Sequence, residues 1–177
     1  EEYFLFKYEN ITDYQRYEFC PEFDHNAFCL SINNWQTAQV FRDKWKTYMR
    51  FKPFFKRECI LITDIEDLQK EPFLSFISAN SVFLMKSLDE CCGRGIQKVT
   101  NIHISPLRDF ISGGGKCILE PYIRQSEEMS LLHPESVNTL RIPTINYGDS
   151  IEIFHPFLRI GRGSSFVDNA GAGGIGC

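Results

Sequence analysis

Helical spacing of apolar residues predicts a first long helix, over residues 34–50. Asn33 or Asn34 is expected to cap this helix, and Pro53 is expected to end it. The spacing places four aromatic residues on one stripe, which we expect to be buried. They are Phe41, Trp45, Tyr48 and Phe55.

Short apolar runs separated by turn residues predict strands along the rest of the chain. The predicted strands cover residues 3–8, 58–63, 81–86, 96–104, 117–120, 137–146 and 150–160, the last two joined by a turn at 147–149. A helix is expected from Thr63 or Asp64 towards Ile77, with Pro72 as an internal break, and a short one over residues 125–131. Hairpin-linked strands mixed with helices predict an α+β fold rather than a doubly wound parallel sheet.

Composition narrows the class of protein. The chain has 177 residues, 43% of them hydrophobic, which excludes global disorder. Its net charge of −4 argues against a protein that coats nucleic acid. No apolar run approaches the ~20 residues of a membrane helix, and no signal-like start is present. Seven cysteines without a CxxC pair favour reduced thiols. We therefore expect a cytoplasmic protein without membrane insertion.

Two clusters carry alternative interpretations. Seven basic residues crowd between Arg42 and Arg57 among aromatic rings, as in a nucleic-acid groove. A solvated helix face explains them better, so no nucleic-acid partner is expected. Four potential zinc ligands lie within ten residues, but their spacing fits no common closed site. They are Cys20, Asp24, His25 and Cys29.

The stretch "SVFLMKSLDECCGRGIQKV" has the composition of a phosphate-binding hairpin. A predicted strand ends in Lys86, and a loop with Gly93, Arg94 and Gly95 leads into the next strand. Glycines let backbone N–H groups approach phosphate oxygens closely, and the lysine adds positive charge. The stretch contains neither a Walker A motif nor GxGxxG, and many ordinary hairpins share these residues.

The order of the later motifs resembles the ATP-grasp enzymes, specifically the sugar-transfer-associated ATP-grasp family. The resemblance rests on "HPESVNTLRI", "LRIGRGSSFVDNAGAGGI" and, more weakly, "NNWQTAQVFRDKWKTYMRF". Ligases that add glutamate to ribosomal protein tails share a similar arrangement of Arg159, Asn169 and Gly173-Gly174. The resemblance implies two α+β lobes that clamp ATP. It divides the chain into a segment 1–33, a first lobe 34–120 and an incomplete second lobe 121–177.

By resemblance, one group of residues binds ATP. Lys44 and Lys86 would contact the α- and β-phosphates, and the glycine loop would cover them. Residues 120–123, including Glu120 and Ile123, would form the hinge beside the adenine. Asn138 would hold the ribose, with Thr139 or Glu127 as alternatives. Lys44 remains equally open to interpretation as a surface lysine.

A second group, again by resemblance, acts on the substrate. Arg141 and Arg159 would face the γ-phosphate and the substrate carboxylate, because a guanidinium binds such oxyanions bidentately. Asp168 and Asn169 would lie in the substrate loop. As alternatives, the two arginines could pair with Glu152 or Asp149 across a hairpin, and Asp168 could cap a turn. His133 and His155 are interpreted as loop residues.

The implied activity is ATP-dependent ligation of a carboxylate to an amine through an acyl phosphate, in cell-surface polysaccharide biosynthesis. ATP and Mg²⁺ would be the cofactors. A small-molecule carboxylate, such as an amino acid, and an amine or sugar-linked acceptor would be the substrates. The family's Mg²⁺ ligands lie on strands after the Gly-Gly loop, so a C-terminally incomplete chain is expected. The alternative is an inactive nucleotide-binding or scaffold protein.

Overall fold

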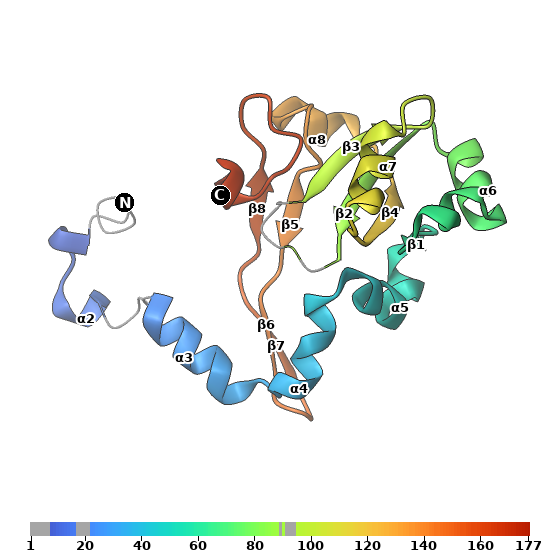
Figure 1. The fold of residues 1–177 in the computed structure, drawn as a ribbon. Helices are drawn as coiled ribbons and strands as arrows, with labels where there is room; N and C mark the ends of the chain where they lie inside the picture. Colours follow the sequence, from blue (N-terminus) through green and yellow to red (C-terminus); the bar gives the residue numbers. More distant parts are fainter. Residues whose placement is uncertain (1–7, 17–21, 89, 91–94) are drawn as a thin grey trace. The chain divides into compact units, whose positions relative to one another are not determined.

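The computed structural model describes residues 8–16, 22–88, 90 and 95–177 (Figure 1). The chain divides into two compact units, Glu1–Val40 and Phe41–Cys177. The predicted strand over residues 3–8 lies almost entirely outside the described residues. The helical elements that begin in the first unit are η1 (Tyr8–Asn10), α2 (Asp13–Arg16), α3 (Glu22–Ile32), α4 (Trp35–Ala38) and η2 (Gln39–Arg42), where η marks a 3-10 helix.

The second unit contains an antiparallel four-stranded sheet, and the described chain is an α+β protein as predicted. The strands are β1 (Ile60–Ile62), β2 (Val82–Ser87), β3 (Ile96–Thr100) and β4 (Cys117–Pro121), in the order β1-β4-β2-β3. The strand of this sheet that comes last in the sequence, β4, therefore lies between the two that come first. It pairs with both in antiparallel register.

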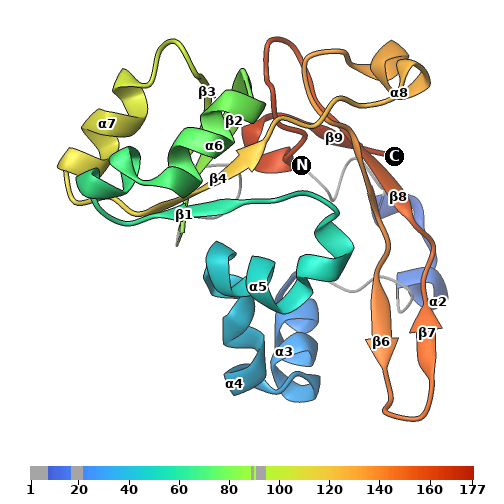
Figure 2. The same cartoon turned by 90° about the vertical axis from the view of Figure 1, so that its right-hand side faces the viewer.

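The two faces of this sheet have different coverings (Figure 2). Side chains alternate between the faces, and alternate residues of β2, such as Phe83 and Met85, enter a core beneath α6 (Glu71–Ala79) and α7 (Ser105–Ser112). The opposite face has a smaller core where α5 (Lys44–Phe55) packs through Tyr48. The described residues include no helix long and apolar enough to cross a membrane.

The sequence predicts one continuous helix over residues 34–50, and this prediction is wrong, because the structure has separate helices there. Asn34 caps α4 as expected, but Asp43 starts a new helix by accepting a hydrogen bond from the Lys46 N–H at 3.0 Å. Pro53 does not end that helix, because the backbone already leaves helical geometry at Phe51 and proline fits the first turn of the piece that follows.

The prediction that the aromatic stripe is buried is also only partly correct. Tyr48 is buried, and Trp45 and Phe55 pack around it. Phe41 is exposed and stacks on Phe51 instead. The break before α5 takes Phe41 off the helix that carries the other three, which explains the difference.

The structure differs from two further predicted elements, and in both cases the difference lies at a proline. The helix from residue 64 is split into η3 (Ile65–Gln69), capped by Asp64, and α6, with Pro72 in its first turn. The strand predicted over residues 96–104 ends at Thr100, and the unpredicted helix α7 follows, with a proline in its first turn. In both places proline starts a helix, because its missing N–H is unpaired there in any case.

The remaining strands form a long, interrupted hairpin, as the pair 137–146 and 150–160 predicted. The helix α8 (Glu127–Leu132) precedes it, close to the predicted 125–131. In the hairpin, β5 (Thr139–Arg141) pairs with β8 (Phe157–Ile160), and β6 (Thr144–Asn146) pairs with β7 (Ile151–Ile153). The short 3-10 helix η4 (Ala170–Ala172) leads to β9 (Ile175–Gly176), which pairs with β8.

Candidate functional site

A cluster of three charged residues lies on the face of the four-stranded sheet that α6 and α7 do not cover. Leu84 of β2 pairs with Glu120 of β4, so Lys86, two residues further along β2, projects from the same face as Glu120. The Lys86 Nζ lies 2.8 Å from Glu120 Oε2. The Arg57 guanidinium, from the turn between α5 and β1, lies 3.0 Å from the same oxygen.

Glu120 is a buried carboxylate that stays charged. Its side chain is only 8% exposed. Burial alone would raise the pKa of Glu120, but the neighbouring Lys86 ammonium and Arg57 guanidinium together hold this pKa below its ordinary value. The carboxylate therefore orients both cations on this face of the sheet.

Arg57 is a site residue that sequence reasoning missed. The basic cluster up to Arg57 was interpreted as a solvated helix face. Arg57 instead follows Lys56, whose left-handed backbone (φ 49°) ends α5, and its guanidinium lies over the Phe55 ring, 4.7 Å from its centre. Neither the left-handed turn nor the carboxylate 63 residues away leaves a local signature in the sequence.

Lys44 lies at the start of α5, beside the end of β2. Its ammonium donates to the backbone carbonyls of Ser87 and Glu90, and its own N–H donates to the Leu88 carbonyl at 3.1 Å. The two predicted phosphate lysines, Lys44 and Lys86, are therefore both brought to the end of the same strand. Lys44 is not simply a surface lysine.

The predicted glycine loop is described only at its end. Gly93 and Arg94 lie outside the described residues. Gly95 has a left-handed backbone (φ 64°), and its carbonyl accepts a hydrogen bond from the Ser87 N–H at 3.0 Å. A Cβ at Gly95 would meet the Glu90 carboxylate carbon at 2.9 Å. The left-handed conformation therefore favours glycine here, and a Cβ would also displace the Glu90 side chain.

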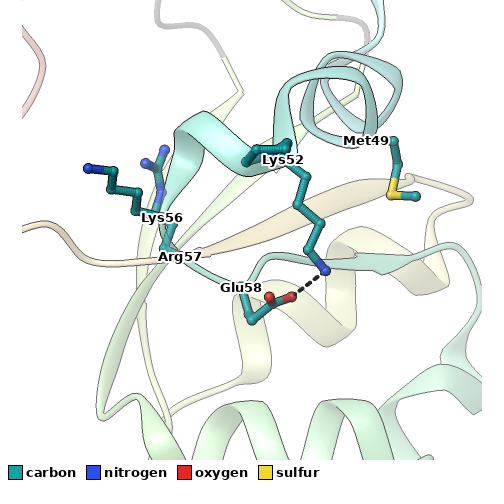
Figure 3. A pocket seen from close by; sticks show the side chains of 6 residues that line it. Met49, Lys52, Lys56, Arg57 and Glu58 are labelled. Carbon is teal, nitrogen blue, oxygen red and sulfur yellow. Dashed lines mark ion pairs between the residues drawn. The ribbon is translucent and has the colours of Figure 1, made fainter.

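Two hollows flank this region. One, of about 190 Å³, follows β4 and is lined by Tyr122, Ile123, Arg124, Gln125, Ser130, Pro134, Ser136 and Val137. It includes the predicted hinge residue Ile123. The other, of about 820 Å³, lies along the end of α5 and the turn after it (Figure 3), and is lined by Met49, Lys52, Pro53, Lys56, Arg57 and Glu58. Arg57 thus connects the second hollow to Glu120.

Asn138 is buried in a network of backbone contacts. Its amide nitrogen donates to the carbonyls of Met129 (2.8 Å) and His133 (3.2 Å). Its amide oxygen accepts from the Ser136 hydroxyl (3.1 Å) and the Gly161 N–H (3.2 Å). These four bonds use the hydrogen-bonding capacity of the amide. A ribose contact for Asn138 stays a prediction, and this arrangement gives it no support.

His133 anchors the loop after β8. Its Nδ1 accepts a hydrogen bond from the Ser136 N–H at 3.2 Å, so Nε2 carries the ring hydrogen and donates it to the Gly163 carbonyl at 2.9 Å. Both ring nitrogens are thus used by the backbone. This agrees with the interpretation of His133 as a loop residue.

Gly161→Ala is expected to lower the free energy of unfolding by about 1–3 kcal/mol, as overpacking does. A Cβ at this position would meet the Ser136 Cβ at 2.8 Å and the His133 Nδ1 at 2.9 Å. It would therefore displace the side chains that hydrogen-bond around Asn138. Urea denaturation checks this result. Gly171→Ala is the matched control, because a Cβ there has no neighbour within 4 Å, and equal losses in the two variants would contradict the expectation.

Arg159 is paired, but not with the acids considered from the sequence. It donates to Asp168 Oδ1 at 3.0 Å, rather than to Glu152 or Asp149. The other Asp168 oxygen accepts from the Thr139 hydroxyl, and Thr139 is the cross-strand neighbour of Arg159. Asp168 is buried and so holds the Arg159 side chain in place.

The other predicted substrate residues lie near Arg159. Arg141 is exposed, and its pairing with Phe157 places it on the same face of β5 and β8 as Arg159. Asn169 follows Asp168, and its carbonyl accepts from the N–H groups of Ala172 and Gly174. The structure thus brings Arg141, Arg159 and Asn169 to one end of the interrupted hairpin.

Mg²⁺ is bound through oxygen ligands, often one or two carboxylates together with substrate phosphates. No group of three or more His, Cys, Asp or Glu side chains in the described ranges could hold a metal ion. The Asp168 carboxylate is occupied by Arg159 and Thr139, and Glu120 by Lys86 and Arg57. Of the four potential zinc ligands, Cys20 lies outside the described residues, and the His25 Nε2 and Cys29 Sγ atoms lie 3.5 Å apart on α3.

No protein-family model matches the sequence. No curated protein matches it either.

Proposed function

We propose that this protein is the nucleotide-binding module of an ATP-dependent carboxylate–amine ligase of the ATP-grasp type. The observation that carries the proposal is the Lys86–Glu120–Arg57 cluster at the end of β2. Two cations and one carboxylate on this face of the sheet leave an excess of positive charge beside a glycine-containing loop. Such a face suits a polyphosphate.

The connections around this cluster support the same proposal. The chain runs from β2 through the glycine loop to β3, through α7 to β4, and then into the segment that lines the 190 Å³ hollow. In the proposal, Lys44 and Lys86 bind the phosphates, the loop covers them, and residues 120–123 lie beside the base. The sequence resemblance assigns the same residues, and the burial and pairing described above are compatible with it.

Arg159, held by Asp168, supports the second half of the chemistry. An ATP-grasp ligase lets a substrate carboxylate oxygen attack the γ-phosphorus while ADP leaves. An amine nitrogen then attacks the acyl carbon, and phosphate leaves. Arg141 and Arg159 would bind the oxyanions and keep them in line for attack. The acceptor class, a sugar-linked amine in polysaccharide assembly, follows from the resemblance alone.

Lys86→Met is expected to weaken ATP binding by about tenfold to a hundredfold, the range for losing one charged hydrogen bond. Isothermal titration calorimetry with ATP, with and without Mg²⁺, measures this effect. Lys70→Met is the matched control, because Lys70 is an exposed lysine between η3 and α6 that pairs with Asp67. Absence of ATP binding to the wild type, or equal affinity in both variants, would refute the proposal.

An inactive nucleotide-binding or scaffold protein is the second candidate. One observation favours it, because the two buried carboxylates near the predicted site, Glu120 and Asp168, are both already paired with cations. The two candidates differ in turnover but not in binding. Release of phosphate from ATP when carboxylates and amines are supplied would select the ligase, whereas ATP binding without turnover would select the scaffold.

A further inference from the structure

The charge balance of the cluster around Glu120 raises a question about Arg57. Lys86 and Arg57 donate to the same oxygen, Oε2. One carboxylate needs only one cation for neutrality, so the second leaves the group with a net positive charge. That surplus depends on Arg57, which sequence reasoning did not assign to the site.

The two residues that follow Arg57 do not alter this balance. Glu58, the next residue, pairs with Lys52 at 2.8 Å and accepts from the Tyr48 hydroxyl at 3.2 Å. Burial, reinforced by the negative charge of Glu120, raises the pKa of the Cys59 thiol to about 11, so the thiol is neutral at pH 7. Arg57 is therefore directed to Glu120.

Arg57 is also the more firmly anchored of the two cations. One guanidinium nitrogen donates to the Phe55 carbonyl at 3.2 Å, and the group lies over the Phe55 ring. The Tyr48 hydroxyl, which accepts from the Cys59 N–H, lies 3.4 Å from the Arg57 carbonyl. Figure 3 shows Arg57 and Lys56 extending to one side of the turn while Lys52 reaches towards Glu58. Lys86 has a single ammonium on a flexible chain.

We propose that Arg57 is a positioning residue for the nucleotide site. It balances the charge of Glu120, so that the Lys86 ammonium can bind a phosphate without leaving a buried carboxylate unpaired. Without Arg57, Lys86 would be the sole counterion of Glu120 and would be withheld from the phosphate. This inference rests on the proposed function, and it predicts a larger effect of Arg57 on phosphate binding than on binding of the base.

The test compares three probes on the full chain by calorimetry: ATP, tripolyphosphate and adenosine. Arg57→Met is expected to weaken ATP and tripolyphosphate binding by about tenfold and to leave adenosine binding within about twofold. Adding Glu120→Gln to Arg57→Met should restore tripolyphosphate binding, because a neutral amide no longer holds Lys86. Arg57→Lys, which keeps the charge, should stay within about threefold of the wild type.

Thermal unfolding of each variant separates positioning from folding. Arg57→Gln is a second neutral variant, with the same expected result, if the methionine variant does not fold. Unchanged tripolyphosphate affinity in a folded neutral variant, or no recovery on adding Glu120→Gln, would overturn the role of Arg57. If ATP binds and Lys86→Met weakens it, the proposed function survives that result. If the wild type binds none of the three probes, both proposals fail.

Discussion

Glu120→Ala is expected to lower the free energy of unfolding by about 3–5 kcal/mol, as when one partner of a buried ion pair is removed. The substitution leaves the Lys86 ammonium and the Arg57 guanidinium facing each other across a buried gap. Their side chains are 20% and 25% exposed, so water compensates them only in part. Urea denaturation at neutral pH measures the loss.

Two controls belong to this experiment. Glu135→Ala removes an exposed glutamate and should change stability by less than about 0.5 kcal/mol. Glu120→Gln keeps the shape without the charge. Because the folded-state pKa of Glu120 lies below its ordinary value of 4.5, the charge stabilises the protein above about pH 4.5. The difference between wild type and Glu120→Gln should shrink as the pH falls below that value. Equal losses in Glu120→Ala and Glu135→Ala would contradict the burial of the pair.

Phe83→Ala is expected to cost about 3–5 kcal/mol, the usual range for truncating a fully buried phenylalanine. Phe83 has no exposed surface and meets the edge of the Phe76 ring, with 5.5 Å between ring centres. Its removal opens a cavity between β2 and α6. Thermal and urea unfolding of the same variant measure the loss.

Leu84→Ala is the matched control for Phe83→Ala. Leu84 follows directly in β2 but projects from the opposite face and is only half-buried. We expect it to cost about 1–2 kcal/mol, in proportion to the smaller area buried. If Leu84→Ala destabilised the protein as much as Phe83→Ala, the assignment of the main core to the α6 and α7 face would be wrong.

The fold was predictable where local pattern decides it. Alternation in β3 and the apolar runs of β2 and β4 indicated strands, and the turn at residues 147–149 indicated a hairpin. The pattern failed where a side chain or a proline starts an element. Asp43 starts α5 within a continuous helical stripe, and Pro72 starts a helix that it was expected to break. Apolar spacing alone does not reveal which capping groups are used.

The sequence indicated individual residues of the candidate site, but it did not predict which of them contact one another. The resemblance pointed to Lys86 and Glu120 separately, whereas their contact depends on the register between β2 and β4. Arg57 was missed because its partner is remote in sequence. Asn138 was selected as a polar residue near a motif, and only the folded chain shows that four neighbours occupy its amide.

The strand order has a consequence for how this unit forms during synthesis. Since β4 lies between β1 and β2, a nascent chain that has not yet reached Pro121 has a β2–β3 hairpin and a β1 strand that lacks its only pairing partner in the sheet. Pairings over such sequence distances are slow, because loop entropy is lost before contacts are gained. Glu120 arrives with the same strand. Lys86 and Arg57 therefore remain hydrated until the final strand inserts, and the charged cluster assembles in the step that completes the sheet.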